Sequence, residues 1–389
     1  MNGLPKVKIN VNKDGLGQVA QTQDGVSAMV LTGDSVTNGI QVGTSVQVFN
    51  LDEAIEKGIT QADNPYAYKH VQQFYEEAPS GTELWIMLVD ATVTMETVVS
   101  SDQDYAKKLL NDAKGVVRLL AVSRKSDGTA TIANGVDADV DAAVVKAQSL
   151  VEGYAINYKE VSVIIDGKDF TGDVGALEDY KQSDNEFVSV MLSNTDGSKN
   201  AAVGLLLGRL AKDPVMRNPG RVKSGSLPTI DAYFTDGKAI EASEGAWDSI
   251  HDKGYIFLRS FVGRSGYFFN DAPTCTTQSN DLNSIPRVRT IYKARRVAYG
   301  VFVNEILDEI PLEANGRIAP ALIKSWEGLV DNAINLTMTQ NGEVSGVRTF
   351  IDPAQDVLGT NEVRVSLDIL PVGYAKYITV QLGFTTNLS

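Results

Sequence analysis

The side chains that most often carry out nucleophilic or metal chemistry are scarce in this sequence. The chain of 389 residues has one cysteine, Cys275, and two histidines, His70 and His251, far apart along it. One cysteine cannot form a disulfide within the chain, and a zinc site built from His and Cys needs more ligands than these. Cys275 also has no nearby histidine in sequence to serve as its base. We therefore expect all three side chains to be structural.

Motifs that bind phosphate or expose a nucleophile are also missing. The sequence has no phosphate loop and no dinucleotide-binding glycine motif, and Gly263-Arg-Ser-Gly266 lacks the spacing of a nucleophile elbow. The acidic run Asp137-Ala-Asp-Val-Asp141 lacks the glycine and the distal glutamate of an EF-hand loop. The helix dipole favours anions at a helix start, so we interpret this run as an N-cap and a first turn. We expect no catalytic residue, no cofactor and no bound metal.

Charge and hydropathy exclude two further classes of partner. The formal net charge is −14, and an acidic chain is a poor ligand for nucleic acid because phosphate neutralisation dominates that affinity. No apolar run approaches the roughly 20 residues of a membrane helix. The N-terminus lacks the apolar region of a secretory signal. We expect neither nucleic-acid binding nor direct membrane insertion, and we expect synthesis and assembly in the cytoplasm.

One segment is basic in this acidic chain. We predict a helix over about 288–305, and its first part carries Arg287, Arg289, Lys293, Arg295 and Arg296 with no acidic residue among them. One interpretation is a face that meets an acidic partner. The alternative is a solvated face whose charges pair within the subunit or between like subunits.

The elements that would position any site alternate between strand and helix. Short apolar runs predict strands at 26–33, 46–49, 83–90, 116–122, 161–165 and 187–192. Helical patterns fall between them, at 50–58, after Pro65, and at about 102–114, 137–154, 173–180 and 199–212. This order favours an α/β core with parallel strand pairs. Gly204 and Gly208, four residues apart, suit close packing of the last helix on a neighbour.

Beyond Pro228 the sequence becomes richer in aromatic residues and strands. We predict strands at 255–262 and 266–269 and a helix over about 320–338. In that helix Leu322, Trp326, Leu329 and Ala333 form a stripe that we expect to be core.

Both ends of the chain alternate strictly between apolar and polar residues. Near the N-terminus the apolar positions are Val7, Ile9 and Val11. At the C-terminus two strands are predicted, over 362–369 and 377–384, the second with Ile378, Val380 and Leu382 on one face. An exposed edge strand invites pairing, so these terminal strands are good candidates for donation to a neighbouring molecule.

Several segments resemble contractile tail sheath proteins of bacteriophages and related injection systems. Asp24–Gly33 resembles the family's opening strand, Val46–Ala54 its next strand and helix, and Tyr68–Val89 the amphipathic helix and core strand that follow. Further similarity, to the sheath branch of phage-like elements in diverse bacteria, lies in Gly204–Leu210, in Asn218–Gly225 and in the segment from Gly254 to Arg289. The last two strands are similar to the family's closing region. The segment from about Ala91 to Ser193 departs from the best-known sheaths.

The resemblance implies a mechanical function. Sheath subunits polymerise helically around an inner tube and pass their terminal arms into the C-terminal domains of adjacent subunits. Repacking into a shorter, wider helix then drives the tube through a target envelope. The implied partners are copies of the chain itself, the inner tail tube protein, and baseplate and tail-terminator proteins, in a virion tail or contractile injection particle. Because the family's C-terminal domain lies nearest the tube, the basic stretch becomes an expected tube-facing patch.

These observations predict a fold class and a division of the chain. We expect an α/β core with a mixed sheet, followed by an α+β C-terminal sheath domain with terminal strands for pairing between subunits. The predicted parts are an N-terminal arm (1–20), the first part of the core (21–90), a central α/β segment that could form an outer or inserted domain (91–195), the sheath domain (196–360) and the C-terminal strands and arm (361–389). Two alternatives stay open: another phage-like structural protein, such as a tube, baseplate or capsid component, and an α/β enzyme with an unrecognised site.

Overall fold

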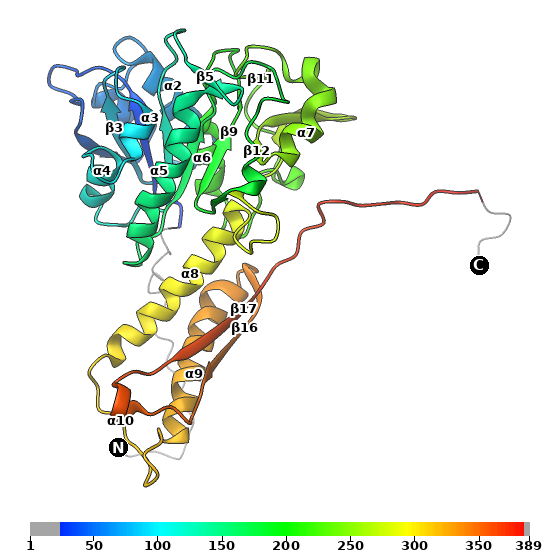
Figure 1. The fold of residues 1–389 in the computed structure, drawn as a ribbon. Helices are drawn as coiled ribbons and strands as arrows, with labels where there is room; N and C mark the ends of the chain where they lie inside the picture. The colour runs from blue at the N-terminus through cyan, green and yellow to red at the C-terminus, as the bar shows by residue number, and fades with distance from the viewer. Residues whose placement is uncertain (1–23, 385–389) are drawn as a thin grey trace, which may run out of the picture.

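The structure, a computed structural model, describes residues 24–384 and consists of two units joined by one long helix (Figure 1). The larger one, here called the sheet unit (residues 24–284), is built around a seven-stranded sheet. The smaller one, the C-terminal unit (residues 303–371), is elongated. Helix α8, Ile285–Phe302, runs from one to the other. After residue 371 the chain leaves the C-terminal unit as an extended segment.

The central sheet is parallel except at one edge. Its strand order is β12-β9-β7-β4-β1-β3-β2, and β2 alone of these runs antiparallel to its neighbour. Near-continuous apolar runs such as Leu84–Val89 suit strands that are covered on both faces. The strands are β1 (Ser27–Thr32), β2 (Ser45–Val48), β3 (Leu84–Val89), β4 (Leu119–Ser123), β7 (Ser162–Asp166), β9 (Val188–Met191) and β12 (Tyr255–Ile256). The six strands predicted before residue 193 are thereby confirmed, and residues 91–195 contribute β4, β7 and β9 to the sheet.

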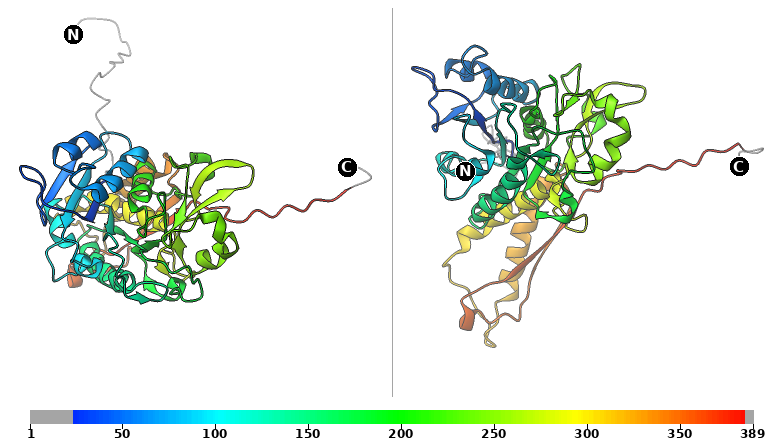
Figure 2. Two further views of the ribbon diagram at one scale, coloured as in Figure 1. Left: turned by 90° about the horizontal axis from the view of Figure 1, so that it is seen from above. Right: turned by 45° about the horizontal axis from the view of Figure 1, so that its top comes forward.

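Helices cover both faces of this sheet. On one face α2 and α6 pack against each other and contact β1; on the other, α3 contacts α5, and α5 contacts β7 and β9 (Figure 2). The helices of the sheet unit are α1 (Leu51–Glu56), α2 (Pro65–Glu77), α3 (Met95–Val99), α4 (Ala106–Asp112), α5 (Ala138–Ala155), α6 (Val203–Lys212) and α7 (Trp247–Asp252). Right-handed crossovers account for this distribution, because connections that run in opposite directions along a sheet place their helices on opposite faces.

Two glycines allow α6 to lie directly on α2. A Cβ atom added at Gly204 would lie 2.1 Å from the carbonyl oxygen of His70, and one at Gly208 would lie 2.4 Å from that of Phe74. No side chain fits at such a distance, so the two backbones are in contact there. The close helix packing expected from the four-residue spacing is confirmed.

Two helices, α1 and α5, start at the capping signals in the sequence. The Asn50 side chain accepts a hydrogen bond from the backbone N–H of Glu53 at 2.9 Å and caps α1. Gly58, with φ of 92°, follows that helix. Asp137 caps α5 by accepting from the N–H of Asp139 at 3.0 Å. The acidic run is therefore a helix start, as we interpreted it.

The helix predicted over 173–180 is wrong. This segment forms turns, and a short 3₁₀ helix follows at Tyr180–Gln182. The Asp173 carboxylate accepts from the backbone N–H groups of Gly175, at 2.9 Å, and Ala176, at 3.3 Å. Such local side-chain bonds compete with the helical hydrogen bonds.

Short elements complete the sheet unit. Four two-stranded pairs flank the sheet: β5 (Ile132–Ala133) with β6 (Val136–Asp137), β8 (Asp184–Asn185) with β15 (Cys275–Thr276), β10 (Ser193–Asn194) with β11 (Tyr233–Phe234), and β13 (Leu258–Phe261) with β14 (Arg264–Phe269). Two further 3₁₀ helices are η2 (Val222–Ser224) and η3 (Ile240–Ala246).

The C-terminal unit packs one helix and one strand pair onto the far end of α8. Its elements are η4 (Val303–Glu305), α9 (Pro320–Ile334) with its π-helical extension η5 (Asn335–Thr339), β16 (Val344–Ile351), α10 (Val357–Thr360) and β17 (Val365–Pro371). Two small apolar clusters hold it, one around Val330 and Met338 and one around Trp326 and Ile351. The fold thus has a mixed α/β sheet followed by C-terminal helices and strands. Among the described residues, no helix is both long and apolar enough to cross a membrane.

Candidate assembly surfaces

The strands β16 and β17 form an antiparallel ribbon with one covered edge and one open edge. Among residues 24–384, neither strand pairs with a third one. On the outer edge of β16, the N–H groups of Thr349 and Ile351 donate to the carboxylates of Asp331 (2.8 Å) and Glu327 (3.0 Å) on α9. These two acids occupy the donors that an added strand would need. The outer edge of β17 is therefore the better place for a further strand.

The C-terminal segment exposes a row of apolar side chains. Residues 372–384 form no strand or helix. Tyr374 and Lys376 contact the sheet unit, and the chain beyond them runs away from the body of the molecule (Figure 2). Ile378, Val380 and Leu382 are 81%, 78% and 97% exposed. The strand predicted over 377–384 is thus an extended segment without a partner in the single chain. Its pairing with another subunit stays a prediction. The corresponding N-terminal residues Val7, Ile9 and Val11 lie outside the described residues.

The basic stretch turns toward the inside of the molecule. Arg289 and Lys293 are buried in α8, and Arg296 binds acidic side chains of the sheet unit. Arg295 donates to the carbonyl of Ala155 at 2.6 Å and lies over an aromatic ring, and Arg287 donates to the carbonyl of Asp281. In the single chain these residues bind groups of the same subunit, which is the alternative that the sequence left open. Contact with a tube stays a prediction.

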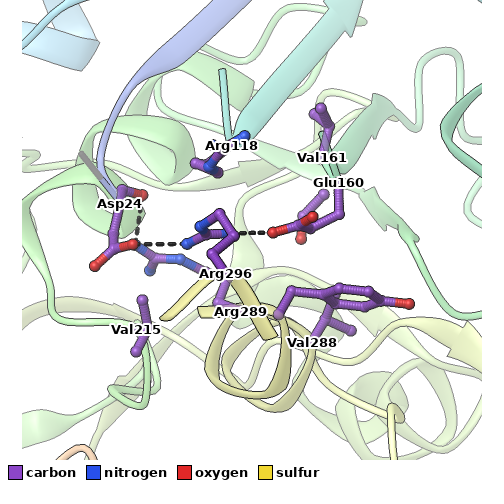
Figure 3. A pocket seen from close by; sticks show the side chains of 10 residues that line it. Asp24, Arg118, Glu160, Val161, Val215, Val288, Arg289 and Arg296 are labelled. Carbon is purple, nitrogen blue, oxygen red and sulfur yellow. Dashed lines mark hydrogen bonds and ion pairs between the residues drawn. The ribbon is translucent and has the colours of Figure 1, made fainter. Parts of the chain in front are cut away.

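Helix α8 is held to both units by a cluster of ion pairs, which we call the α8 cluster: Asp24, Glu160, Lys293, Arg296 and Glu343. Lys293 Nζ lies 2.8 Å from Asp24 Oδ2 and 2.7 Å from Glu343 Oε2. Arg296 lies between Asp24 and Glu160 and binds both (Figure 3). Asp24 precedes β1, Glu160 precedes β7 and Glu343 precedes β16, so this cluster connects the sheet unit to the C-terminal unit through α8.

Burial determines the electrostatics around this cluster. Arg118 and Arg289 line the same small pocket (Figure 3), and burial lowers the pKa of each to about 10. Burial also raises the pKa of Glu343. A buried ion is costly unless it is paired and hydrogen-bonded. Arg289 donates two hydrogen bonds to backbone carbonyls, those of Asp24 and Asp213. The Nε and Nη1 atoms of Arg289 are buried without a hydrogen-bond partner. The ion pairs of the α8 cluster itself can hold the elements together.

The three residues considered for chemistry lie in separate places. Cys275 is buried in β15, and burial raises the pKa of its thiol. His70 is buried in α2 between the helices, and His251 in α7 contacts the amide of Asn270 at 3.2 Å. Among the described residues, no three His, Cys, Asp or Glu side chains are grouped so that they could hold a metal ion.

A polar cluster that sequence reasoning missed lies where β4 and β7 end. Asp166 accepts hydrogen bonds from the Asn200 side chain (2.7 Å), the Ala201 N–H (2.6 Å) and the Ser123 hydroxyl. Burial raises the pKa of this carboxyl to about 6. The carboxyl end of a parallel sheet is where α/β enzymes place ligands, but Asp166 is 0% exposed. Its partners all come from the chain itself, so the cluster fixes the segment before α6.

Comparison with protein families gives two matches that together span most of the chain. The family described as DUF2586, N-terminal domain, matches residues 4–273, and the one described as DUF2586, C-terminal domain, matches residues 281–389. The chain belongs to the DUF2586 family. The boundary between its two domains falls just before α8. Comparison with curated protein sequences gives no match.

The DUF2586 chain shares its fold with components of contractile injection systems. A chain of the anti-feeding prophage (AFP) baseplate superposes with a TM-score of 0.63 at 15% identity, covering 100% of both chains. A chain of the contracted AFP helical sheath gives 0.62 at 14% identity, again over 100% of both. A chain of the contracted PVC sheath complex, from an extracellular contractile injection system, gives 0.58 at 13%, over 100% of this chain and 98% of that one. These neighbours are sheath and baseplate assemblies.

Proposed function

We propose that this DUF2586 protein is the protomer of a contractile sheath, which polymerises helically around an inner tube and contracts to drive that tube through a target envelope. The observation that carries the proposal is the similarity of fold, over the full length, to chains of two contracted sheaths. The chain also has an open strand edge, on β17, and an exposed extended segment at its C-terminus, and the segment of one subunit can pair with the edge of another.

The contact we propose is strand exchange. A neighbour's C-terminal segment adds to the outer edge of β17, with Ile378, Val380 and Leu382 turned toward the apolar side of the ribbon. Main-chain hydrogen bonds then supply affinity, and alternate side chains fix the register. The N-terminal strand around Val7, Ile9 and Val11 makes the second such link. Arms of this kind keep subunits connected while their bodies move as rigid units during contraction.

The remaining partners belong to the same proposal. Besides itself, the protomer binds an inner tail tube protein, a baseplate and a tail terminator, within a phage tail or injection particle assembled in the bacterial cytoplasm. The tube contact includes the partly exposed Arg287 and Arg295 of the expected patch, because Arg289 and Lys293 are buried and Arg296 is held by Asp24 and Glu160. The work is mechanical, and the protomer needs no catalytic residue for it.

Electron microscopy of the purified full-length chain tests the proposal. A sheath protomer gives long hollow cylinders, alone or on addition of the tube protein. The similarity to a chain of the AFP baseplate favours a baseplate component as the second candidate. That protein would give closed rings of fixed subunit number and no cylinders. Discrete small particles under all conditions would contradict both functions.

A further inference from the structure

The loop that follows α6 is connected through Arg289 to the beginning of the described chain, and it contacts the C-terminal segment directly. We call residues 213–218 the anchor loop. It lies between α6 and β11, and its backbone carbonyls and one amide side chain face segments that are more than fifty residues away in sequence.

The N-terminal side of this contact is made through Arg289. One nitrogen of this guanidinium, Nη2, donates to the carbonyl of Asp24 at 3.2 Å and to the carbonyl of Asp213 at 3.3 Å. The next residue, Gly25, lies so close to the end of α6 that a Cβ there would be 2.6 Å from the Ala211 carbonyl oxygen. The position of Asp24 is therefore defined relative to the anchor loop.

The C-terminal side is made by two residues just before the exposed alternating segment. The Tyr374 hydroxyl donates to the carbonyl of Met216. Lys376 Nζ lies 2.6 Å from one carboxylate oxygen of Asp271, and the Asn218 amide donates to the other at 2.5 Å. Asp271 is 5% exposed, so Lys376 neutralises a buried charge. The tail leaves the body of the molecule only after this point.

We propose that the anchor loop is a mechanical link between the two ends of the described chain: it fixes Asp24 and the segment from Tyr374 to Lys376 on the sheet unit, and a displacement of one loosens the other. Arg289 cannot keep both of its carbonyl partners if the loop moves relative to Asp24. The Tyr374 and Lys376 contacts likewise cannot persist if Met216 and Asn218 move away. The link is a property of the single chain. If the proposed function holds, a subunit whose C-terminal arm is captured by a neighbour also has its N-terminal arm released.

A spin label next to the anchor tests this link in the unassembled full-length protein. Cys275 is 0% exposed, so a nitroxide attached at Ala375→Cys labels that site alone. We expect a largely immobilised spectrum in the parent protein. Lys376→Met should at least double the mobile fraction by removing the direct contact. Arg289→Lys, which keeps the charge but loses the forked donor geometry, should raise it comparably through the loop. Arg348→Met, which breaks an exposed ion pair of the ribbon, is the matched control and should leave the spectrum unchanged.

Each result bears on the proposal. An unchanged spectrum in Arg289→Lys together with a mobile one in Lys376→Met would show two independent anchors and overturn the link. An unchanged spectrum in Lys376→Met would show that the tail is not held at Asp271, which also overturns it. Gly25→Ala provides a second remote variant if Arg289→Lys does not fold, as judged by its melting curve, because the added Cβ would lie 2.6 Å from the Ala211 carbonyl oxygen and would displace the backbone next to Asp24. Because no assembly is needed, the outcome is independent of whether the chain forms cylinders.

Discussion

His70 is a titratable group that the fold buries completely. Both ring nitrogens are buried without a hydrogen-bond partner, and the ring packs edge-on against Tyr66 at 4.8 Å between centroids. Burial, with Lys69 nearby, holds the pKa of His70 well below its usual value. The unfolded chain therefore binds a proton near pH 6.5 that the native chain does not bind. The contribution of His70 to stability is thus lost as the pH falls below that value.

This sign leads to a measurable pH dependence. Between pH 7 and pH 5 the free energy of unfolding should fall by up to about 1.4 kcal/mol per pH unit through this one group. His70→Phe keeps an aromatic ring and should remove that component of the slope. His251→Gln serves as the control for the loss of a histidine. Urea unfolding at several pH values gives the answer, and identical slopes in the parent and His70→Phe would contradict it.

The close contact at Gly204 leads to a second prediction, which concerns the stability of a single substitution. Since its Cβ would lie 2.1 Å from a backbone carbonyl, Gly204→Ala must push α6 away from α2. We expect a loss of about 1–3 kcal/mol, the usual cost of overpacking. Gly153→Ala in α5 is the matched control, because nothing lies within 4 Å of the added methyl group there. That variant should be neutral or stabilising by helix propensity. Equal denaturation midpoints for the two variants would refute the close contact.

In the basic stretch, the spacing of the residues along the sequence indicates which of them share a face of the helix. Arg289, Lys293 and Arg296 are separated by four and three residues, so they share one face of α8, the face that binds Asp24, Glu160 and Glu343. The spacing identifies a common face. It does not say whether that face meets another molecule or the same chain, because the acidic partners come from three distant parts of the sequence.

Among the elements, the C-terminal segment carries the sharpest test of strand exchange. The triple variant Ile378→Ser, Val380→Ser and Leu382→Ser should leave a soluble chain with the parent's melting temperature, because these side chains are largely exposed in the monomer. It should not form cylinders, since the apolar face of the donated strand is lost. Changing Thr379 and Gln381 to Ser on the opposite face is the control and should preserve assembly. Normal cylinders from the triple variant would rule out C-terminal exchange.

Elements of this fold differ in how far the sequence determines them. Buried parallel strands are runs of apolar residues, and the five predicted before residue 193 are present, as is the sixth predicted strand, the antiparallel edge strand β2. In the predicted core stripe of α9, Trp326 is buried as expected, but the other three positions are wrong by one residue: Ile323, Val330 and Ile334 are buried, whereas Leu329 is 47% exposed. The predicted and the observed stripe both have helical spacing. Which of the two is buried depends on where α8 and β16 pack against α9. The polar cluster around Asp166 could not be predicted either, because its members meet only in the folded sheet.

At the scale of the whole molecule, α8 determines how the two units are oriented. Its first turns, with Ile285 and Val288, belong to the core of the sheet unit, whereas Ala294 and Val297 pack in the C-terminal unit. One continuous helix therefore crosses the boundary between two separate apolar cores. The charged partners of Lys293 lie on the two sides of that boundary, Asp24 before β1 and Glu343 before β16. A change in the relative orientation of the units must break or rearrange these pairs.

Removal of that buried cation should therefore destabilise the whole chain far more than removal of an exposed one. Lys293→Met leaves two carboxylates facing each other without their shared counterion, and breaking a buried pair in this way costs about 3–5 kcal/mol. Lys324→Met removes an exposed partner of Glu327 and should cost less than about 1 kcal/mol. Calorimetry of the two variants should show a lower transition for Lys293→Met, with separate melting of the two units if the α8 cluster is what couples them. If Lys293→Met instead melts as one transition within a degree of Lys324→Met, apolar packing of α8 alone holds the units together.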